Sequence, residues 1–326
     1  MDDNQPPDRE QHYQPEQQNG MYELEVPAPQ LSSSDGRGPV LVHALEGFSD
    51  AGHAIRLATS HLKETLDTEL VASFAIDELL DYRSRRPLMT FKTDHFAHYD
   101  DPELRLYAMH DSAGTPFLLL AGMEPDLKWE RFITAVRLLA ERLGVRQTIG
   151  LGAIPMAVPH TRPVTMTAHS NNRELIADFT PWITEVQVPG SASNLLEYRM
   201  AQHGHEVVGF TVHVPHYLAQ TGYPAAAHAL LKQVAKTGLL QLPLKALEEA
   251  AVEIAARVDE QVEASPDVAQ VVATLERQYD AFIADQEERS LLTRDDDLPS
   301  GDELGAEFER FLAQEAEKKF DDDDPK

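Results

Sequence analysis

Charged side chains gather in three short segments that also contain glycine or proline, and these residues are the ones with which the chain could do chemistry. The segments are 46–52 (EGFSDAG), 81–87 (DYRSRRP) and 122–129 (GMEPDLKW). A carboxylate in a cleft can serve as a general base, and an arginine fork suits carboxylates or phosphates. If the segments converge on one pocket, Glu46 or Glu124 is the candidate base, and Arg83 or Arg86 is the candidate anion clamp.

Each segment also has a structural interpretation, which stays open. Segment 46–52 has the composition of a joint between a strand and a helix, with glycine in the turn and Ser49 or Asp50 as the helix N-cap. The arginines of 83–86 can pair with acidic neighbours in the same chain or across a subunit interface. Asp126 is a good N-cap for the helix expected after it. In these interpretations the same residues hold the fold rather than a ligand.

A fourth segment, 156–163, is rich in proline and contains His160 and Arg162. Because proline fixes the backbone, we expect an ordered, non-helical loop that lines a cleft or an interface. The candidate ligand-binding residues are therefore Glu46, Gly47, Asp50, Arg83, Arg86, Glu124, His160 and Arg162.

No familiar catalytic motif is complete in the sequence, and we assign no catalytic residue. Among the 14 histidines, the close pairs 95/98 and 203/205 lack a clear third ligand, so we expect no metal. Segment 150–155 lacks the third glycine of a dinucleotide-binding loop, and we expect no cofactor. A Ser-His-Asp set could still assemble from distant positions.

Strand-like and helix-like segments alternate along residues 38–238, and they must position these loops. The expected strands are 40–45, 70–76, 104–109, 117–121, 148–153, 164–168, 186–188 and 207–214. The expected helices are 51–66, 127–143, 192–202 and 223–236. Several strands are apolar throughout, as expected when both faces are covered. The pattern predicts a three-layer α/β/α domain with a mixed, mostly parallel sheet, whose strand ends carry the candidate residues.

Beyond residue 238 the apolar residues step by three and four, which is typical of amphipathic helices. Ser265 and Pro266 mark a turn between two of them, and 298–301 precedes a third, shorter set around Phe308. The first two should pack as an αα-hairpin on the α/β domain or on a neighbouring subunit. We therefore predict a disordered leader (1–37), the α/β/α domain (38–238), a helical extension (239–316) and an acidic tail (317–326).

Composition narrows the classes of partner. The formal net charge of −27 argues against nucleic acid and against anionic membranes, because both attract clustered lysine and arginine. The chain has no cysteine, which excludes thiolate chemistry and disulfides and suits a cytoplasmic protein. No run of 18 apolar residues occurs, so we expect no membrane span.

Six segments, taken together and in order, resemble the bacterial branch of the proteasome assembly chaperone 2 family. They are 46–52, 82–87, 122–126 with Trp129, 156–163, 189–197 and 214–218. The resemblance implies an α/β/α domain similar in topology to purine nucleoside phosphorylases and related hydrolases. It also implies self-association as a trimer or a higher oligomer. It implies no particular reaction.

Two functions from different classes follow. The first is an oligomeric protein-binding or assembly-chaperone-like protein without catalysis, and the missing catalytic motifs favour it. The alternative is a protein that binds a nucleoside or an anionic metabolite, or a hydrolase- or phosphorylase-like enzyme, working through the loops at the strand carboxyl ends. An assembly-chaperone-like protein would bind further copies of the same chain and also another protein.

Overall fold

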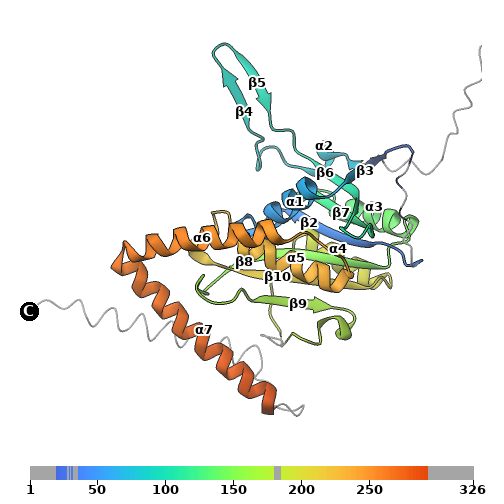
Figure 1. Cartoon of the computed structure of the whole chain (residues 1–326). Helices are drawn as coiled ribbons and strands as arrows, with labels where there is room; N and C mark the ends of the chain where they lie inside the picture. Colours follow the sequence, from blue (N-terminus) through green and yellow to red (C-terminus); the bar gives the residue numbers. More distant parts are fainter. Residues whose placement is uncertain (1–19, 28, 30, 32–35, 180–184, 293–326) are drawn as a thin grey trace, which may run out of the picture.

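A computed structural model describes residues 20–27, 29, 31, 36–179 and 185–292 (Figure 1). Most of the expected leader, the third helical set around Phe308 and the acidic tail lie outside the described residues.

A central sheet organises the described part of the chain, and there it has eight strands in the order β1-β3-β6-β7-β2-β8-β10-β9. The strands are β1 (Tyr22–Leu24), β2 (Val40–Glu46), β3 (Thr68–Phe74), β6 (Leu104–His110), β7 (Pro116–Met123), β8 (Gln147–Met156), β9 (Met166–Ser170) and β10 (Val207–Pro215). Strands β7, β2, β8 and β10 are parallel, and antiparallel strands flank them on both sides. The sheet is therefore mixed, with a parallel centre.

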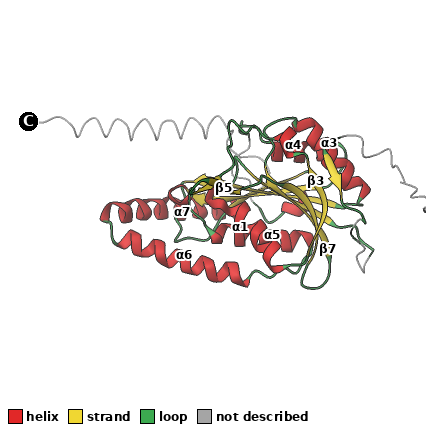
Figure 2. Cartoon of the chain, turned by 90° about the horizontal axis from the view of Figure 1, so that it is seen from above, coloured by secondary structure: helices red, strands yellow, loops and turns green. Residues whose placement is uncertain are grey.

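Helices cover both faces of the sheet, as Figure 2 shows from above. On one face lie α1 (Ala54–Thr65), which follows the 3-10 turn Ala51–His53, and α5 (Pro224–Gly238). On the other lie α3 (Trp129–Arg142) and α4 (Ala192–Gln202). The short helix α2 (Ile76–Leu79) follows β3. This arrangement confirms the predicted three-layer α/β/α fold.

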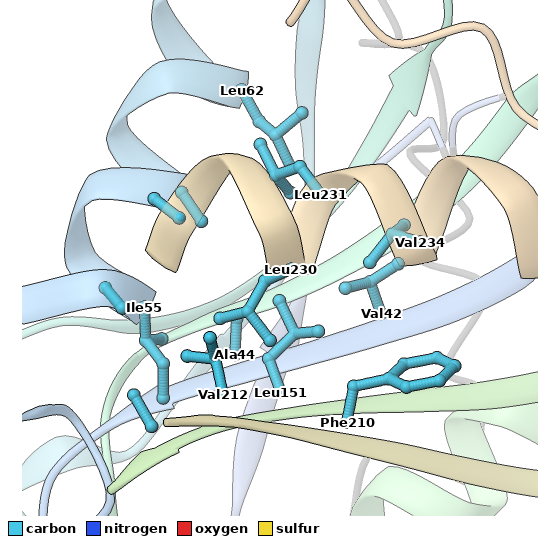
Figure 3. Close-up of a cluster of buried hydrophobic side chains, with 14 of the residues drawn as sticks. Val42, Ala44, Ile55, Leu62, Leu151, Phe210, Val212, Leu230, Leu231 and Val234 are labelled. Atoms are coloured by element: carbon cyan, nitrogen blue, oxygen red, sulfur yellow. The ribbon is translucent and has the colours of Figure 1, made fainter. Parts of the chain in front are cut away.

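Alternating side chains along each strand divide the core into two layers. Val42 and Ala44 of β2 pack with α1 and α5, whereas Leu41 and Leu45 pack with α3. Figure 3 shows the first layer, in which side chains of the helices lie over those of β2, β8 and β10. The labelled members are Val42, Ala44, Ile55, Leu62, Leu151, Phe210, Val212, Leu230, Leu231 and Val234.

The structure departs from the predicted elements at several places. Tyr22–Leu24, within the segment predicted as a disordered leader, form strand β1 and pair with β3, and Met21 beside them is buried. Residues 186–188 form no strand, and Val186 and Val188 are exposed. Residues 89–99, for which we predicted no structure, form a hairpin of β4 (Met89–Lys92) and β5 (His95–Tyr99). The hairpin projects away from the rest of the molecule (Figure 1). Without a core to cover it, a short hairpin carries no regular alternation of apolar residues for sequence reasoning to detect.

Two long helices follow the α/β/α layers. Helix α6 (Lys245–Glu263) packs against α5, and α7 (Pro266–Leu292) returns from it after a turn at Ala264 and Ser265. The structure therefore confirms a helical C-terminal region. None of the described helices combines the length and apolar character that crossing a lipid bilayer requires.

Candidate functional site at the strand carboxyl ends

Four parallel strands end at one rim of the sheet, and the loops that follow them form the candidate site. Strands β2, β7, β8 and β10 end at Glu46, Met123, Met156 and Pro215. Because neighbouring parallel strands run in one direction, their carboxyl ends meet at the same rim. The loop segments identified from the sequence are thereby brought together.

Two adjoining clefts open at this rim. The first, of about 460 Å³, is lined by residues that include Glu46, Gly47 and Asp50. The second, of about 430 Å³, is lined by residues that include Glu124, Trp129 and Ser191. Phe48, whose side chain is 70% exposed, and Arg85 line both clefts. The two candidate bases therefore lie in neighbouring clefts, joined by Phe48 and Arg85.

Asp50 lies beside the start of α1, and its carboxylate faces the helix. Its Oδ1 accepts a hydrogen bond from the backbone N–H of Ile55 at 2.7 Å. Burial raises the pKa of Asp50 to about 6, although the bond from Ile55 opposes the rise. Asp50 thus satisfies a backbone donor in the first turn of α1, although the residue at the N-cap of that helix is His53 rather than Ser49 or Asp50.

Glu124 is buried, and its carboxylate joins three loops. Oε2 accepts the backbone N–H of Phe48 at 3.2 Å, and Oε1 accepts the backbone N–H of Ser193 at 3.3 Å. A Cβ atom at Gly47 would overlap the carboxylate, so only glycine lets the loop after β2 approach so closely. The side chain therefore sits between the loop after β2 and the start of α4, with both oxygens engaged.

Of the three neighbouring arginines, Arg85 is the one that enters the site. Its Nη2 donates to the backbone carbonyl of Glu124 at 2.7 Å, and its Nε donates to Oδ1 of Asp126 at 3.0 Å. Arg83 and Arg86 are exposed, and Arg86 lines a further cleft near the base of the hairpin. The three arginines thus have different environments that their sequence spacing did not distinguish.

Asp126 does not cap α3, contrary to the capping prediction. Its Oδ2 instead accepts the backbone N–H of Asp81 at 2.9 Å, while Oδ1 pairs with Arg85. Helix α3 begins after Lys128, which is left-handed with φ of 56° and gives no side-chain cap. Both carboxylate oxygens of Asp126 therefore bind the arginine segment and hold it against the loop after β7. Neither oxygen is left to cap α3.

His160 and Arg162 lie on the loop after β8 and face the two long helices. His160 shares a hydrogen bond with the hydroxyl of Tyr217 at 2.7 Å and another with Asp259 of α6 at 3.0 Å. Arg162 forms ion pairs with Glu276 and Asp280 of α7. These two candidate residues therefore connect the rim to α6 and α7 and do not line the two clefts described above.

Sequence reasoning missed a polar cluster beneath α4. His43, Gly150, Gly209 and His169 form one row across β2, β8, β10 and β9. Glu197 of α4 lies over the two glycines and contacts both histidines.

The first histidine also reaches a serine, because Ser193 Oγ lies 3.2 Å from Nδ1 of His43. Burial by itself would raise the pKa of Glu197, but the hydrogen bond to His169 and the close contact with His43 outweigh burial and lower the pKa to about 2. The cluster thus holds an ionised carboxylate inside the protein. The signal available in the sequence was a histidine within the apolar run 40–45.

The chain is similar in sequence to one protein family and similar in structure to several solved proteins. The model of the PAC2 family matches residues 44–262. No curated protein matches the sequence.

Three solved structures illustrate the similarity. A Mycobacterium tuberculosis protein of unknown function is 84% identical, with a TM-score of 0.81, over 83% of this chain and 93% of that chain. A Corynebacterium glutamicum protein of unknown function is 45% identical, with a TM-score of 0.77, over 81% and 98%. A Mycobacterium tuberculosis proteasome-assembly chaperone homologue is 25% identical, with a TM-score of 0.66, over 72% and 99%.

Proposed function

The chain belongs to the PAC2 family, and we propose that it is an oligomeric protein-binding protein with an assembly-chaperone-like role. We include self-association as a trimer or higher oligomer, a further protein partner and a cytoplasmic location in this proposal. The similarity to the proteasome-assembly chaperone homologue supports the role. We also retain the division into a leader (1–37), an α/β/α domain (38–238), a helical extension (239–316) and an acidic tail (317–326).

The observation that carries the proposal is the exposed β4–β5 hairpin. All nine residues of its strands are exposed in the isolated chain. Phe91 and Phe96 are 58% and 64% exposed and contact each other edge to face, with ring centroids 5.2 Å apart. A two-stranded hairpin is marginally stable by itself in water, and exposed aromatic residues are enriched in protein interfaces. Contact with another protein surface would bury the exposed aromatic side chains of the hairpin.

Leu88, Met89 and Tyr99 extend the same apolar surface along the hairpin. Acidic residues follow it at Asp100 and Asp101, which gives the apolar surface a polar border. A buried apolar centre with a polar border is the usual arrangement of a specific interface. We infer that the hairpin is the contact through which the copies of the chain associate.

Sedimentation velocity of the full chain tests the association. The wild type should sediment as a trimer or larger species, and Phe91→Ser with Phe96→Ser should dissociate it. Loss of one aromatic anchor typically weakens an interface by about 2 kcal/mol, roughly 30-fold in affinity. Val186→Ser with Val188→Ser is the matched control, because it removes two exposed apolar side chains elsewhere. A wild type that stays monomeric at high concentration contradicts the proposal.

A second experiment tests the protein partner. The full chain, used as bait in a native lysate, should retain another protein in a defined ratio to itself. Recovery of the bait alone, from lysates in which it is folded and associated, would count against an assembly-chaperone-like role while leaving self-association intact.

A further inference from the structure

Ser193, His43 and Glu197 lie in the order that nucleophilic catalysis requires. Ser193 Oγ is 3.2 Å from His43 Nδ1, and His43 Nε2 is 3.2 Å from Glu197 Oε1. The second distance is a close contact between the imidazole ring and the carboxylate, and its angle falls short of an aligned hydrogen bond. A hydroxyl, an imidazole and a carboxylate in series form the arrangement that activates serine nucleophiles on unrelated folds.

The ionised carboxylate favours one tautomer of His43. Because Glu197 attracts a proton to Nε2, the lone pair of the neutral ring is left on Nδ1, which faces the serine hydroxyl. His43 is fully buried and Glu197 is nearly so. The glycines at positions 150 and 209 make room for the carboxylate above the sheet. The base is therefore oriented by groups that are themselves fixed by packing.

Two backbone donors lie beside the same serine. Acyl transfer needs N–H groups that stabilise the negative charge on the carbonyl oxygen, commonly one from the nucleophile's own residue or its neighbour and one from a second loop. Here the N–H of Ser193 donates to Oε1 of Glu124 and the N–H of Phe48 donates to Oε2, so one carboxylate bridges the two donors. Both bonds, at 3.3 and 3.2 Å, are at the long end of the normal range. A carboxylate of the protein thus satisfies both donors, one through each of its oxygens, and keeps them from any substrate oxygen.

The adjoining cleft has the size and lining for a small acyl compound. Its volume of about 430 Å³ lies within the range of small-molecule sites. Phe48, Pro125, Trp129 and Pro189 give it apolar walls, and Glu124 and Ser191 lie in its lining. Removing Glu124 from its two N–H donors would open a route from the cleft to the serine.

We propose that Ser193 is the nucleophile of an acyl-transfer site for esters or thioesters with a small apolar acyl group, and that Glu124 holds this site closed. In the reaction a bond forms between Ser193 Oγ and the acyl carbon, and the bond from that carbon to the leaving oxygen or sulfur breaks. The hydroxyl proton passes to His43 Nδ1 and then to the leaving group. Water activated by His43 then hydrolyses the acyl-serine, and Ser193 regains its proton.

A serine-directed fluorophosphonate probe tests the proposal on the full chain, with peptide mass spectrometry to locate the label. Glu124→Ala should be labelled at Ser193 at least about tenfold faster than the wild type, since two amide donors become free. Glu124→Gln, which keeps the volume but not the charge, should fall between them. The same order should hold for hydrolysis of p-nitrophenyl butyrate.

Ser193→Ala in the Glu124→Ala background should abolish labelling, and His43→Gln should slow it at least about 100-fold, the usual scale of general-base catalysis. Ser84→Ala, at an exposed serine of the arginine segment, should change nothing. Unfolding curves establish that each variant is folded, and the serine variant carries the test if His43→Gln is not. A folded Glu124→Ala that remains unlabelled, or a label elsewhere than Ser193, overturns the proposal.

Discussion

The carboxylate of Glu197 occupies the space above Gly150 that any larger residue at position 150 would need. A Cβ atom there would overlap Glu197 Oε1 and would crowd Nε2 of His43. Gly209 has the same relation to His169 on the other side of the carboxylate. The two glycines therefore exist at these positions because a buried charge and its two histidines lie over the sheet.

Gly150→Ala should destabilise the fold strongly. The new methyl group must displace a buried carboxylate from its histidine partners, and overpacking together with disruption of a buried ion pair costs about 3 kcal/mol or more. Urea unfolding measures the loss. Gly222→Ala is the matched control, because its Cβ would meet only Leu57 Cδ1, at an ordinary 3.7 Å. An unchanged midpoint for Gly150→Ala would show that the cluster adapts freely.

The layered fold could be predicted because its signals are local. Apolar runs such as 40–45 and 207–214 mark strands covered on both faces, and these strands are observed. The expected helix 192–202 is observed with the same bounds, since Ser191 caps it by accepting the N–H of Asn194. Capping and strand composition depend on residues close in sequence, and one sequence displays them.

The polar cluster could not be predicted, because its members come from distant parts of the chain. Ser193 and His43 are 150 positions apart. The glycine at position 150 was noticed in the sequence, but only as part of an incomplete dinucleotide loop. Glycine is needed at position 150 because the carboxylate of Glu197, on a helix later in the chain, lies over it. No spacing rule connects these two residues. Long-range contacts of this kind become visible only when the strands are aligned in a sheet.

The contribution of Asp50 to stability should decline as the pH rises through the titration of its carboxyl group, while the lowered pKa of buried His213 contributes in the opposite direction. The pKa of Asp50 is about 6 in the folded protein and 3.8 without the fold, so the folded state binds the proton more tightly. The resulting stability is full below about pH 4 and is lost as the pH rises to about 6. Asp50→Asn should flatten this decline and leave the variant about 1 kcal/mol more stable than wild type at pH 7, since asparagine also offers an oxygen to the N–H of Ile55.

Thermal unfolding between pH 4 and pH 8 measures the effect of Asp50→Asn. Asp50→Ala distinguishes the effect of the charge from the effect of the hydrogen bond to Ile55. Asparagine removes only the charge, whereas alanine removes both the charge and the acceptor. If wild type and Asp50→Asn show parallel pH profiles, burial of Asp50 does not control the titration.

Arg162→Gln should loosen α7 from the rim. The guanidinium pairs with Glu276 and Asp280, and hydrogen bonds from Thr161 to Glu276 and from Tyr279 to Pro163 join the same segments. Solvent screens an exposed ion-pair network, so its loss has a modest effect, and amide exchange in α7 should accelerate about fivefold.

Hydrogen exchange followed by mass spectrometry measures the effect of Arg162→Gln peptide by peptide. Exchange in β2 and β8 should not change, because the core there is independent of α7. Arg277→Gln is the control, since the side chain of Arg277 contacts Thr274 within α7 itself. Equal acceleration in both variants would mean that the rim contacts do not hold the helix.

The three clustered arginines should respond differently to the same conservative change. Arg85→Lys should destabilise the protein by about 1 to 2 kcal/mol, because one ammonium cannot reproduce the fork that joins Asp126 to the carbonyl of Glu124. Arg83→Lys and Arg86→Lys alter exposed side chains and should stay within about 0.5 kcal/mol of wild type. Urea unfolding of the three variants provides the comparison. Equal effects at all three positions would mean that overall charge density, rather than the Arg85 contacts, stabilises the segment beside the two clefts.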